Sequence, residues 1–269
     1  MNNINDKDDF QQPKNIEEFK SWFKNKFHCD SDTYINYYDV ATNALCNNFL
    51  TSSFWKDFQN ELQNINDQYL MKKGYQLLSN TDAPEINIKS LNSLLIKAFR
   101  KNVINNDLFP NAPKTGWINQ NNWFESINDI LRTTIVVKYL DGVEYIINHL
   151  AIIAERNGCD FDYSYEAREE GYYAAHVGVK VELGLINESF ISEQKKINIE
   201  IQITTELQEI IKTLLHKHYE ENRKRLHPRK EMWQWDYHCD EFASNYLGHI
   251  VHYVEGMIVE IRDKQQNNK

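Results

Sequence analysis

Apolar residues in the first third of the chain recur at steps of three and four, the period of an amphipathic helix. This pattern extends over residues 16–78 and predicts mainly helical structure, after a solvated tail at residues 1–15. Residues 79–84 interrupt the pattern, and a further helix is predicted over residues 90–100. Residues 102–122 carry two prolines and a glycine, which predicts a long loop.

Further along the chain the apolar residues follow the period of two that is typical of strands. Residues 133–137 are Thr-Thr-Ile-Val-Val, a β-branched run that indicates a buried strand. Residues 175–183 alternate, with Ala, Val and Leu on one face and His, Gly, Lys and Glu on the other. Residues 197–203 alternate isoleucine with Asn, Glu and Gln. The chain is therefore expected to contain a sheet.

Helical patterns separate and follow these strands. One helix is predicted over residues 141–156, an amphipathic helix begins near Leu207, and a last helix covers residues 239–262. Helices that alternate with strands predict an α/β (α+β) fold in which a mixed sheet is flanked by helices. We expect a helical N-terminal region over residues 16–84 and one domain over residues 85–265 that includes the C-terminal helix.

Composition narrows the class of protein. The 269 residues include 30 Lys and Arg against 39 Asp and Glu, and the net charge of −9 argues against a protein that coats nucleic acid through bulk charge. The four cysteines form no Cys-x-x-Cys pair, so neither a disulfide scaffold nor a thiolate zinc site is expected. Because neither a signal peptide nor an apolar run of about 18 residues is recognisable, we expect a cytoplasmic protein without a membrane partner.

The polar face of the strand at residues 197–203 has two interpretations. Glu200 and Gln202 could lie on the wet face of an antiparallel strand. They could instead form the floor of a site, with Asp129, which precedes the β-branched strand, as a second acid. Two carboxylates from neighbouring strands suit Mg²⁺, a hard cation whose remaining ligands are often phosphates and water. The residues alone leave both interpretations open.

Four short strings stand in a fixed order along the chain. Lys89, Ser93 and Lys97 lie at steps of four. Asp129 leads Ile-Leu-Arg into a strand, residues 170–176 read Glu-Gly-Tyr-Tyr-Ala-Ala-His, and residues 199–205 read Ile-Glu-Ile-Gln-Ile-Thr-Thr. In order and spacing these strings resemble the synthetase domain of the RelA/SpoT family, the pyrophosphokinases that make the alarmones ppGpp and pppGpp. The resemblance covers roughly residues 85–219. It points to a short, synthetase-only member, because the chain has no His-Asp dipeptide and no length for a hydrolase half.

The resemblance implies a nucleotidyltransferase-like fold and a reaction. Members transfer the β,γ-pyrophosphate of ATP to a ribose 3′-hydroxyl, and such a transfer depends on positioning and on neutralising phosphate charge. For this chain the implied acceptor is GDP or GTP. The implied catalytic residues are Asp129, Glu200 and Gln202, of which Asp129 and Glu200 hold Mg²⁺. The residues implied for ATP are Lys89, Ser93, Lys97 and Arg132, and those implied for the acceptor are Gly171, Tyr172, His176 and His216.

Three positions depart from the family's pattern. Asn87, Thr134 and Thr204 stand where the family has arginines, and Arg132 takes a small residue's position. Such changes resemble divergent members, including toxins of toxin–antitoxin pairs that pyrophosphorylate the 3′-CCA end of tRNA and have an antitoxin protein as partner. A second alternative is a non-catalytic nucleotide- or RNA-binding module whose site has decayed. The sequence leaves the oligomeric state open.

Two further features concern the C-terminal part. Residues 217–230 concentrate cations, which a tRNA acceptor stem could use, although the same charges suit the solvated end of a helix. The cations proposed for such a patch are Arg223, Lys224, Arg225, Arg229 and Lys230. His249 and His252 complete no ligand set with zinc spacing and are interpreted as structural or edge-of-site histidines. Trp233 and Trp235 are expected to pack the last helix onto the core.

Overall fold

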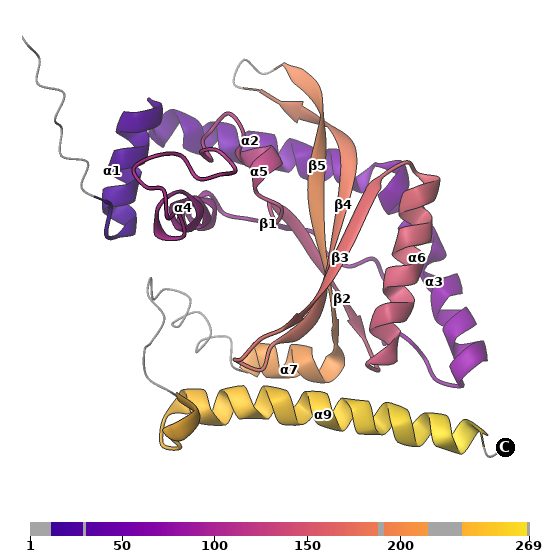
Figure 1. The fold of residues 1–269 in the computed structure, drawn as a ribbon. Coiled ribbons are helices and arrows are strands. Elements are labelled where there is room, and N and C mark those ends of the chain that lie inside the picture. The colour runs from indigo at the N-terminus through magenta and orange to yellow at the C-terminus, as the bar shows by residue number, and fades with distance from the viewer. Residues whose placement is uncertain (1–11, 29–30, 188–190, 215–232, 268–269) are drawn as a thin grey trace, which may run out of the picture.

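The computed structural model describes residues 12–28, 31–187, 191–214 and 233–267. One sheet of five strands, in the order β1-β2-β5-β4-β3, forms its centre (Figure 1). β2 and β5 are parallel, whereas the other neighbouring pairs are antiparallel, so the sheet is mixed. The predicted fold class is therefore confirmed. The strands are β1 (Asn87–Ile88), β2 (Leu131–Val137), β3 (Asp160–Ala167), β4 (Tyr173–Ile186) and β5 (Ser192–Thr205).

Helices flank the sheet, and their ends follow local signals. The side chains of Asn15 and Ser52 accept hydrogen bonds from first-turn amides of α1 and α3, and Gly74 ends α3 with a left-handed φ of 72°. No helix within the described residues is long and apolar enough to span a membrane. The helices are α1 (Ile16–Phe27), α2 (Ser31–Leu50), α3 (Ser53–Lys73), α4 (Leu91–Phe99), α5 (Trp123–Ser126), α6 (Asp141–Arg156), α7 (Glu206–Leu214) and α9 (Asp240–Asn267), with short helical turns at Arg100–Ile104 and Trp233–Trp235.

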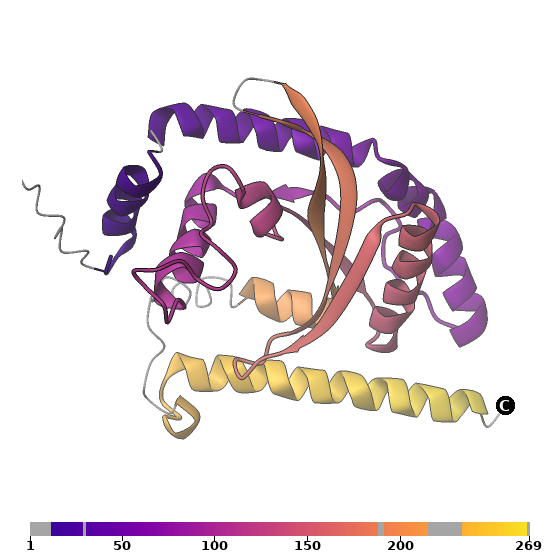
Figure 2. The same ribbon diagram turned by 45° about the horizontal axis from the view of Figure 1, so that its top comes forward.

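Helices lie at both ends of the sheet and on both of its sides, with α6 and α3 on one side and α1, α4 and α5 on the other (Figures 1 and 2). α2 crosses β4 near one end, and α6 lies along the sheet with α3 packed outside it. α7 and α9 lie next to each other at the other end. The face of the sheet that α6 does not cover carries the polar residues of β2, β5 and β4, and it is the face on which a site can form.

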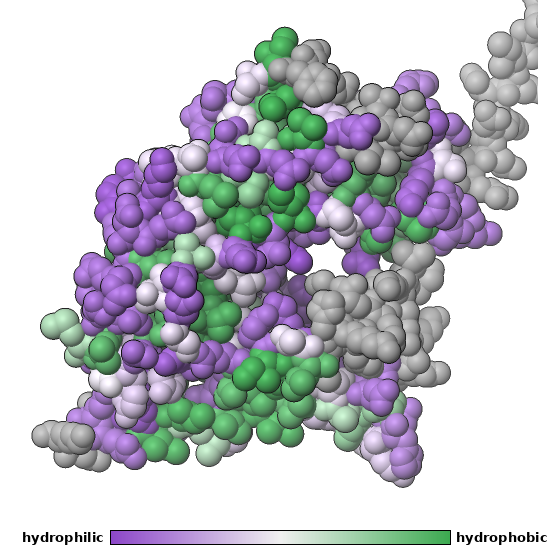
Figure 3. Space-filling model, turned by 180° about the vertical axis from the view of Figure 1, so that it is seen from behind, coloured by the Kyte–Doolittle hydropathy of each residue, from purple (hydrophilic) through white to green (hydrophobic). Residues whose placement is uncertain are grey.

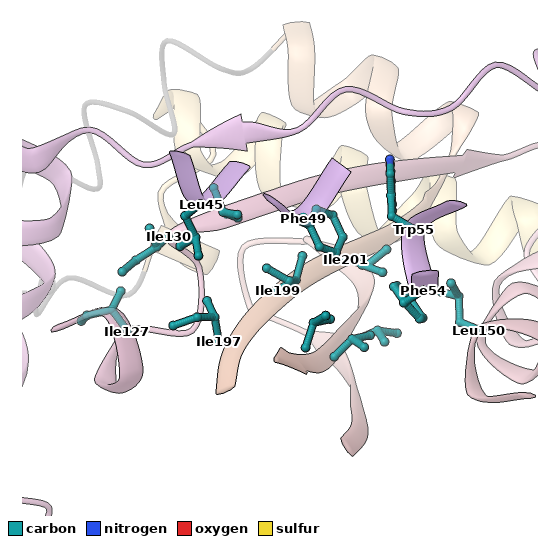
Figure 4. Packing of buried hydrophobic residues seen from close by; sticks show 14 of the residues in the cluster. Leu45, Phe49, Phe54, Trp55, Ile127, Ile130, Leu150, Ile197, Ile199 and Ile201 are labelled. Carbon is teal, nitrogen blue, oxygen red and sulfur yellow. The ribbon is translucent and has the colours of Figure 1, made fainter. Parts of the chain in front are cut away.

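The core lies between the apolar face of the sheet and the N-terminal helices (Figure 4). Ile199 of β5 is fully buried in one cluster with Leu45, Phe49 and Trp55 from α2 and α3. Alternate residues of β5 turn to this cluster, which places the residues between them on the opposite face. Burying each such side chain contributes about 1.5–3 kcal/mol, so the register of β5 is strongly determined.

The sequence pattern does not predict β1 and β3. β1 is too short for any period to be recognised. β3 forms an edge of the sheet, and most of its residues are exposed. Its aromatic residues Phe161, Tyr163 and Tyr165 alternate with Asp162 and Ser164, but the acidic residues of this segment are uncommon in strands and weaken the strand signal.

The C-terminal helix α9 turns its apolar stripe outward. A band of hydrophobic side chains runs along the lower edge of the molecule in Figure 3, where α9 lies. Exposed fractions reach 57% at Ile250 and 70% at Tyr253. The buried side chains of α9 are instead largely polar, namely Ser244, Asn245, Glu255 and Arg262. Polar contacts therefore hold this helix on the domain.

The two tryptophans before α9 differ in their surroundings. The Trp233 ring lies edge-on to Tyr246 of α9, with centroids 5.5 Å apart. The Trp235 side chain is 79% exposed. The expectation that both residues pack the last helix onto the core is therefore wrong for Trp235, whose side chain is largely exposed to solvent.

Candidate functional site

Three neighbouring strands bring four of the expected site residues to one face of the sheet. Glu200 of β5 lies in register with Arg132 of β2, and Gln202 lies in register with His176 of β4. Residues that oppose each other on adjacent strands share a face. The apolar residues of β5 occupy the other face, so these four polar side chains lie together on the face away from the core.

Glu200 is held by hydrogen bonding on this floor. The Gln202 side chain donates from Nε2 to Glu200 Oε1 over 2.7 Å. His176 Nδ1 lies 3.8 Å from the same oxygen, and the Glu200 side chain is only 17% exposed. The carboxylate thus has one firm partner and one imidazole within electrostatic range, which restricts its orientation on a rigid strand.

Asp129 lies in the turn before β2 and meets two lysines from distant parts of the chain. Lys89 Nζ is 2.8 Å from Asp129 Oδ2, and Lys97 Nζ is 2.8 Å from Oδ1. The backbone N–H of Lys89 donates to the carbonyl of Ile130, which fixes Lys89 beside this turn. Lys97 reaches the carboxylate from the last turn of α4. The tertiary fold therefore joins two of the four strings.

The charge of Asp129 is stabilised by this arrangement. Burial by itself would raise the pKa of the carboxyl, but the hydrogen bonds and charges of Lys89 and Lys97 outweigh burial and lower the pKa from 3.8 to about 2. Asp129 is consequently ionised at neutral pH, and it offers two hard oxygen atoms surrounded by cations.

Lys101 belongs to the same group of cations and was missed by the sequence interpretation. Partial burial, followed by the charge of Lys97, lowers its pKa, while Asp129 acts in the opposite direction. Lys97 and Lys101 are four residues apart and therefore project from the same side of the helical segment. This spacing is a signal that the sequence already contained.

Two other residues, Arg132 and Ser93, are expected to bind ATP. The ion pairs of Asp129 are made by Lys89 and Lys97, not by these two residues. Arg132 is exposed on β2 and lies in register with Asn87 of β1 as well as with Glu200. Ser93 is exposed in the first turn of α4, where its N–H donates to Ser90 Oγ, the cap of the helix. Ser93 therefore has a structural role in the helix start.

A tight hairpin between β3 and β4 carries Gly171 and Tyr172. Gly171 N donates to Arg168 O over 3.0 Å, and Arg168 N donates to Tyr172 O over 3.1 Å. Gly171 has a φ of 74°, the left-handed conformation that a short hairpin loop of this kind needs at its last position. A side chain there would be strained, which explains the glycine.

Tyr172 stands at the open end of the polar face. Its hydroxyl lies 3.0 Å from His176 Nε2, so His176 bridges Tyr172 and Glu200. The Arg168 guanidinium lies 5.3 Å from the centre of the Tyr172 ring. A narrow cleft beside the hairpin is lined by Gly171, Tyr172, Tyr173, Gln202, Thr204, Gln208, Ile211 and Lys212. Lys212, which lines this cleft, and Arg168, beside the Tyr172 ring, are cations that the sequence interpretation did not single out.

The three positions that lack a family arginine have different surroundings. Thr204 is buried, and its hydroxyl donates to the carbonyl of Tyr173 over 3.3 Å. Thr134 lies beside Gln202 on the polar face, in register with it. Asn87 is exposed on β1. Among them only Thr204 has become part of the packing, where an arginine side chain would need a different arrangement of the β4 start.

The donor set bears on the expected Mg²⁺. Asp129 and Glu200 supply carboxylate oxygens, the ligand type that this ion prefers, and Asp129 is ionised. Within the described residues no group of three or more His, Cys, Asp or Glu side chains is placed to hold a metal. The residues present therefore fit an ion that substrate phosphates help to ligate, and they do not form a complete protein cage.

Some expected site residues cannot be placed. His216 and the cations of the basic segment, Arg223, Lys224, Arg225, Arg229 and Lys230, lie outside the described residues. The acceptor role of His216 and the tRNA patch remain sequence-based predictions.

Solved structures with this fold are known, although no protein-family model and no curated protein sequence matches the chain. A GTP pyrophosphokinase family protein from Streptococcus pneumoniae aligns over 87% of this chain and 94% of its own, with 17% identity and a TM-score of 0.52. Small alarmone synthetase 1 from Bacillus subtilis aligns over 81% of this chain and 96% of its own, with 18% identity and a TM-score of 0.51. At this identity the likeness concerns the fold alone, and the chain has the fold that the small alarmone synthetases share.

Proposed function

We propose that the protein is an ATP-dependent pyrophosphokinase that transfers the β,γ-pyrophosphate of ATP to the ribose 3′-hydroxyl of GDP or GTP. The observation that carries this proposal is the chain of contacts Tyr172–His176–Glu200–Gln202 across the polar face. In this proposal the Tyr172 ring at one end of this chain of contacts stacks on the acceptor base, and the Glu200 carboxylate within it accepts the hydroxyl proton. The shared fold with small alarmone synthetases supports it.

In the proposed reaction the 3′-oxygen of the acceptor attacks the β-phosphorus of ATP, the bond from that phosphorus to the α-phosphate oxygen breaks, and AMP leaves. Glu200 receives the hydroxyl proton, and Gln202 holds the carboxylate toward the acceptor through its hydrogen bond. Since phosphoryl-type transfer needs charge neutralisation more than covalent chemistry, the cations near Asp129 are the second requirement.

Lys89 and Lys97 are the residues proposed to bind the ATP phosphates. Both ammonium groups are already gathered at Asp129, so no separate ordering of these long side chains is needed when phosphates arrive. Mg²⁺ held by Asp129 and Glu200 would neutralise charge on the transferred phosphates. The lysines would then exchange Asp129 oxygens for phosphate oxygens.

Tyr172 is proposed to stack on the acceptor base. Stacking of a base on an aromatic side chain contributes about 1–3 kcal/mol and depends little on the hydrogen-bonding groups at the edges of the base. The Arg168 guanidinium near the ring adds a cation where acceptor phosphates would lie. A guanine nucleotide is the proposed acceptor because Gly171, Tyr172 and His176 all retain the family's residue types.

The test is transfer of label from [γ-³²P]ATP in separate reactions with GDP, GTP and deacylated tRNA. Label on a guanine nucleotide, with an equal amount of AMP released, is the expected result. Label in tRNA alone would overturn the acceptor while retaining pyrophosphate transfer. Absence of both label transfer and AMP with all three acceptors would favour the non-catalytic module. The matched control for Glu200→Gln is Glu182→Gln. Glu182 is exposed and lies further along β4, six residues beyond His176.

A further inference from the structure

The tip of the β3–β4 hairpin is pressed against the C-terminal helix. A Cβ atom added to Gly171 would lie 2.3 Å from Asn245 O and 3.1 Å from Gly248 Cα of α9. Conversely, a Cβ atom added to Gly248 would lie 2.2 Å from Gly171 O. The two backbones can approach this closely only because both positions are glycine.

Tyr173, the residue after the proposed base-stacking tyrosine, completes the contact. Successive residues of a strand point to opposite sides, so Tyr173 turns away from Tyr172 and toward α9. Its ring lies flat on the His252 ring, with centroids 3.7 Å apart and an interplanar angle of 5°. Its hydroxyl lies 2.8 Å from His249 Nδ1.

His249 also holds the loop itself. Its Nε2 lies 2.9 Å from the carbonyl oxygen of Glu169. A carbonyl can only accept, so Nε2 carries the proton, and in the neutral imidazole Nδ1 then accepts from the Tyr173 hydroxyl. One histidine of α9 therefore binds both the loop backbone and the first residue of β4.

These contacts lie directly behind the acceptor cleft. Tyr173 and Gln208 line that cleft on one side. On their other side they line a cavity of about 560 Å³, to which His252 and Gly256 of α9 also contribute. Gln208 Nε2 donates to Gly248 O over 3.3 Å. The wall of the cleft is thus fastened to α9 by side chains that face away from the substrate.

We propose that α9 is a positioning element of the acceptor site, in which Gly248, His249 and His252 fix the hairpin so that Tyr172 and His176 face the acceptor. This inference rests on the proposed function, because it assigns the hairpin to the acceptor. Lys89 and Lys97 are held at Asp129, whereas the contacts of α9 with the hairpin are made by Gly248, His249 and His252. Loosening α9 therefore raises the KM for the acceptor and leaves the KM for ATP unchanged.

The sharpest test compares two substitutions in the same helix. Gly248→Ala and Gly256→Ala both raise helix propensity, by about 1 kcal/mol. A Cβ atom at Gly248 meets Gly171 O, whereas one at Gly256 meets nothing within 4 Å. We expect Gly248→Ala to raise the KM for the acceptor about tenfold, because a change of this size corresponds to losing the contact between the Tyr172 ring and the base. The KM for ATP should stay unchanged. Gly256→Ala is expected to behave as wild type.

Two variants at Tyr173 and one at His249 separate positioning from folding. Tyr173→Phe keeps the stack on His252, and Tyr173→Leu loses it, so the phenylalanine variant should retain most of the acceptor affinity. His249→Ala should raise the acceptor KM. In each impaired variant, amide hydrogen exchange of residues 169–173 should speed up while exchange in the central strands stays unchanged.

Three results would overturn the proposal. The first is identical acceptor KM in Gly248→Ala and Gly256→Ala. The second is faster exchange of the hairpin amides with no change in acceptor KM, and the third is an equal rise of the KM for both substrates. If the wild-type protein transfers no pyrophosphate at all, the proposed function fails separately. Hydrogen exchange of the hairpin amides and GDP binding measured by calorimetry then still decide whether α9 fixes an acceptor loop.

Discussion

Glu200 owes its place to a simple alternation along β5. The residues on either side of it, Ile199 and Ile201, are fully buried, so Glu200 must point to the other face. On that face it meets Gln202 and His176, which limit its motion. A carboxylate on a central strand is held more rigidly than one on a loop, and rigid placement is what a general base requires.

We therefore expect Glu200→Gln to lower kcat by about 10²–10⁴-fold, the usual contribution of a positioned general base. The fold should survive, because the amide is isosteric and the side chain lies on a partly open face. Steady-state AMP release measures the loss of kcat, and the thermal unfolding midpoint shows whether the fold survives. Full activity of Glu200→Gln, with Glu182→Gln equally active, would contradict the assignment.

Asp129 links the site to stability at low pH. Its pKa is about 2 in the folded protein and 3.8 ordinarily, so the folded state holds the ionised form more tightly. The stabilisation is fully present above pH 4 and is lost as pH falls toward 2, and it amounts to about 2 kcal/mol. Asp129→Asn should remove this pH-dependent part.

The measurement is urea unfolding of wild type and Asp129→Asn between pH 7 and pH 3. The difference in free energy of unfolding between the two proteins should shrink as the solution becomes more acidic. The control is Asp160→Asn, which breaks an exposed ion pair with Lys196. Its free energy of unfolding should differ little from that of wild type, and this difference should change little with pH. A constant difference for Asp129→Asn would refute the coupling to the lysines.

At the scale of elements, the pairing of β1 with β2 offers an account of a missing arginine. Asn87 stands where the family has an arginine, and Arg132 lies directly opposite it on β2. Opposing residues of an antiparallel pair lie about 4.5–5.5 Å apart at Cβ, which is within the reach of a guanidinium. We propose that Arg132 supplies the cation for ATP from β2, directly opposite the position on β1 where the family has it.

We predict that Arg132→Gly raises the KM for ATP about tenfold, since a charge-assisted contact to phosphate contributes about 1.5–3 kcal/mol. The double variant Asn87→Arg/Arg132→Gly should regain most of the affinity, because it returns the cation to β1. Initial rates at varied ATP and saturating acceptor provide the test. A double variant as weak as Arg132→Gly would count against the exchange of positions.

Considering the whole molecule, α9 is fastened at both ends while its middle exposes apolar side chains. Near its start it meets the hairpin at Gly171. Near its end the buried Arg262 guanidinium contacts Asp141 at 2.6 Å and donates to the Tyr69 hydroxyl at 3.1 Å. The second anchor ties α9 to Asp141 of α6 and Tyr69 of α3.

Arg262→Met should lower the free energy of unfolding by about 2 kcal/mol. Breaking a buried pair by removing one partner typically costs about 3–5 kcal/mol, and Lys73, 3.2 Å from Asp141, offsets part of the loss. Urea unfolding measures it. A double-mutant cycle of Arg262→Met with Asp141→Asn should give a coupling energy close to this loss of stability. The control Lys264→Met removes an exposed ion pair and should change the free energy of unfolding by less than about 1 kcal/mol.

Much of the fold could be predicted because it is written in short-range patterns. The helix predicted over residues 141–156 matches α6 residue for residue, since it has a strong apolar stripe and ends at Asn157. The strands around His176 and Glu200 extend beyond the predicted ranges by a few residues at each end. The pattern does not predict edge strand β3, because most of its residues are exposed and its acidic residues weaken the signal of the alternating aromatic residues.

The candidate site was predictable in part. The resemblance to the RelA/SpoT family implies Asp129, Glu200 and Tyr172 as site residues, and their chemistry remains a prediction. The resemblance did not indicate that Lys101 joins the lysines or that Arg168 reaches the Tyr172 ring. Such contacts join segments whose relative placement depends on how helices pack, and local periodicity carries no information about that packing.

By itself the sequence determined which face of each central strand is buried, because alternation of isoleucine with Glu200 and Gln202 allows one orientation only. Tertiary structure alone decided that Lys89 and Lys97 meet at Asp129 and that α9 holds the hairpin through Gly248 and His249. The physical reason is that burial of a side chain follows from its neighbours along the chain. A contact between distant segments follows from the packing of whole elements, which is optimised only once the core has formed.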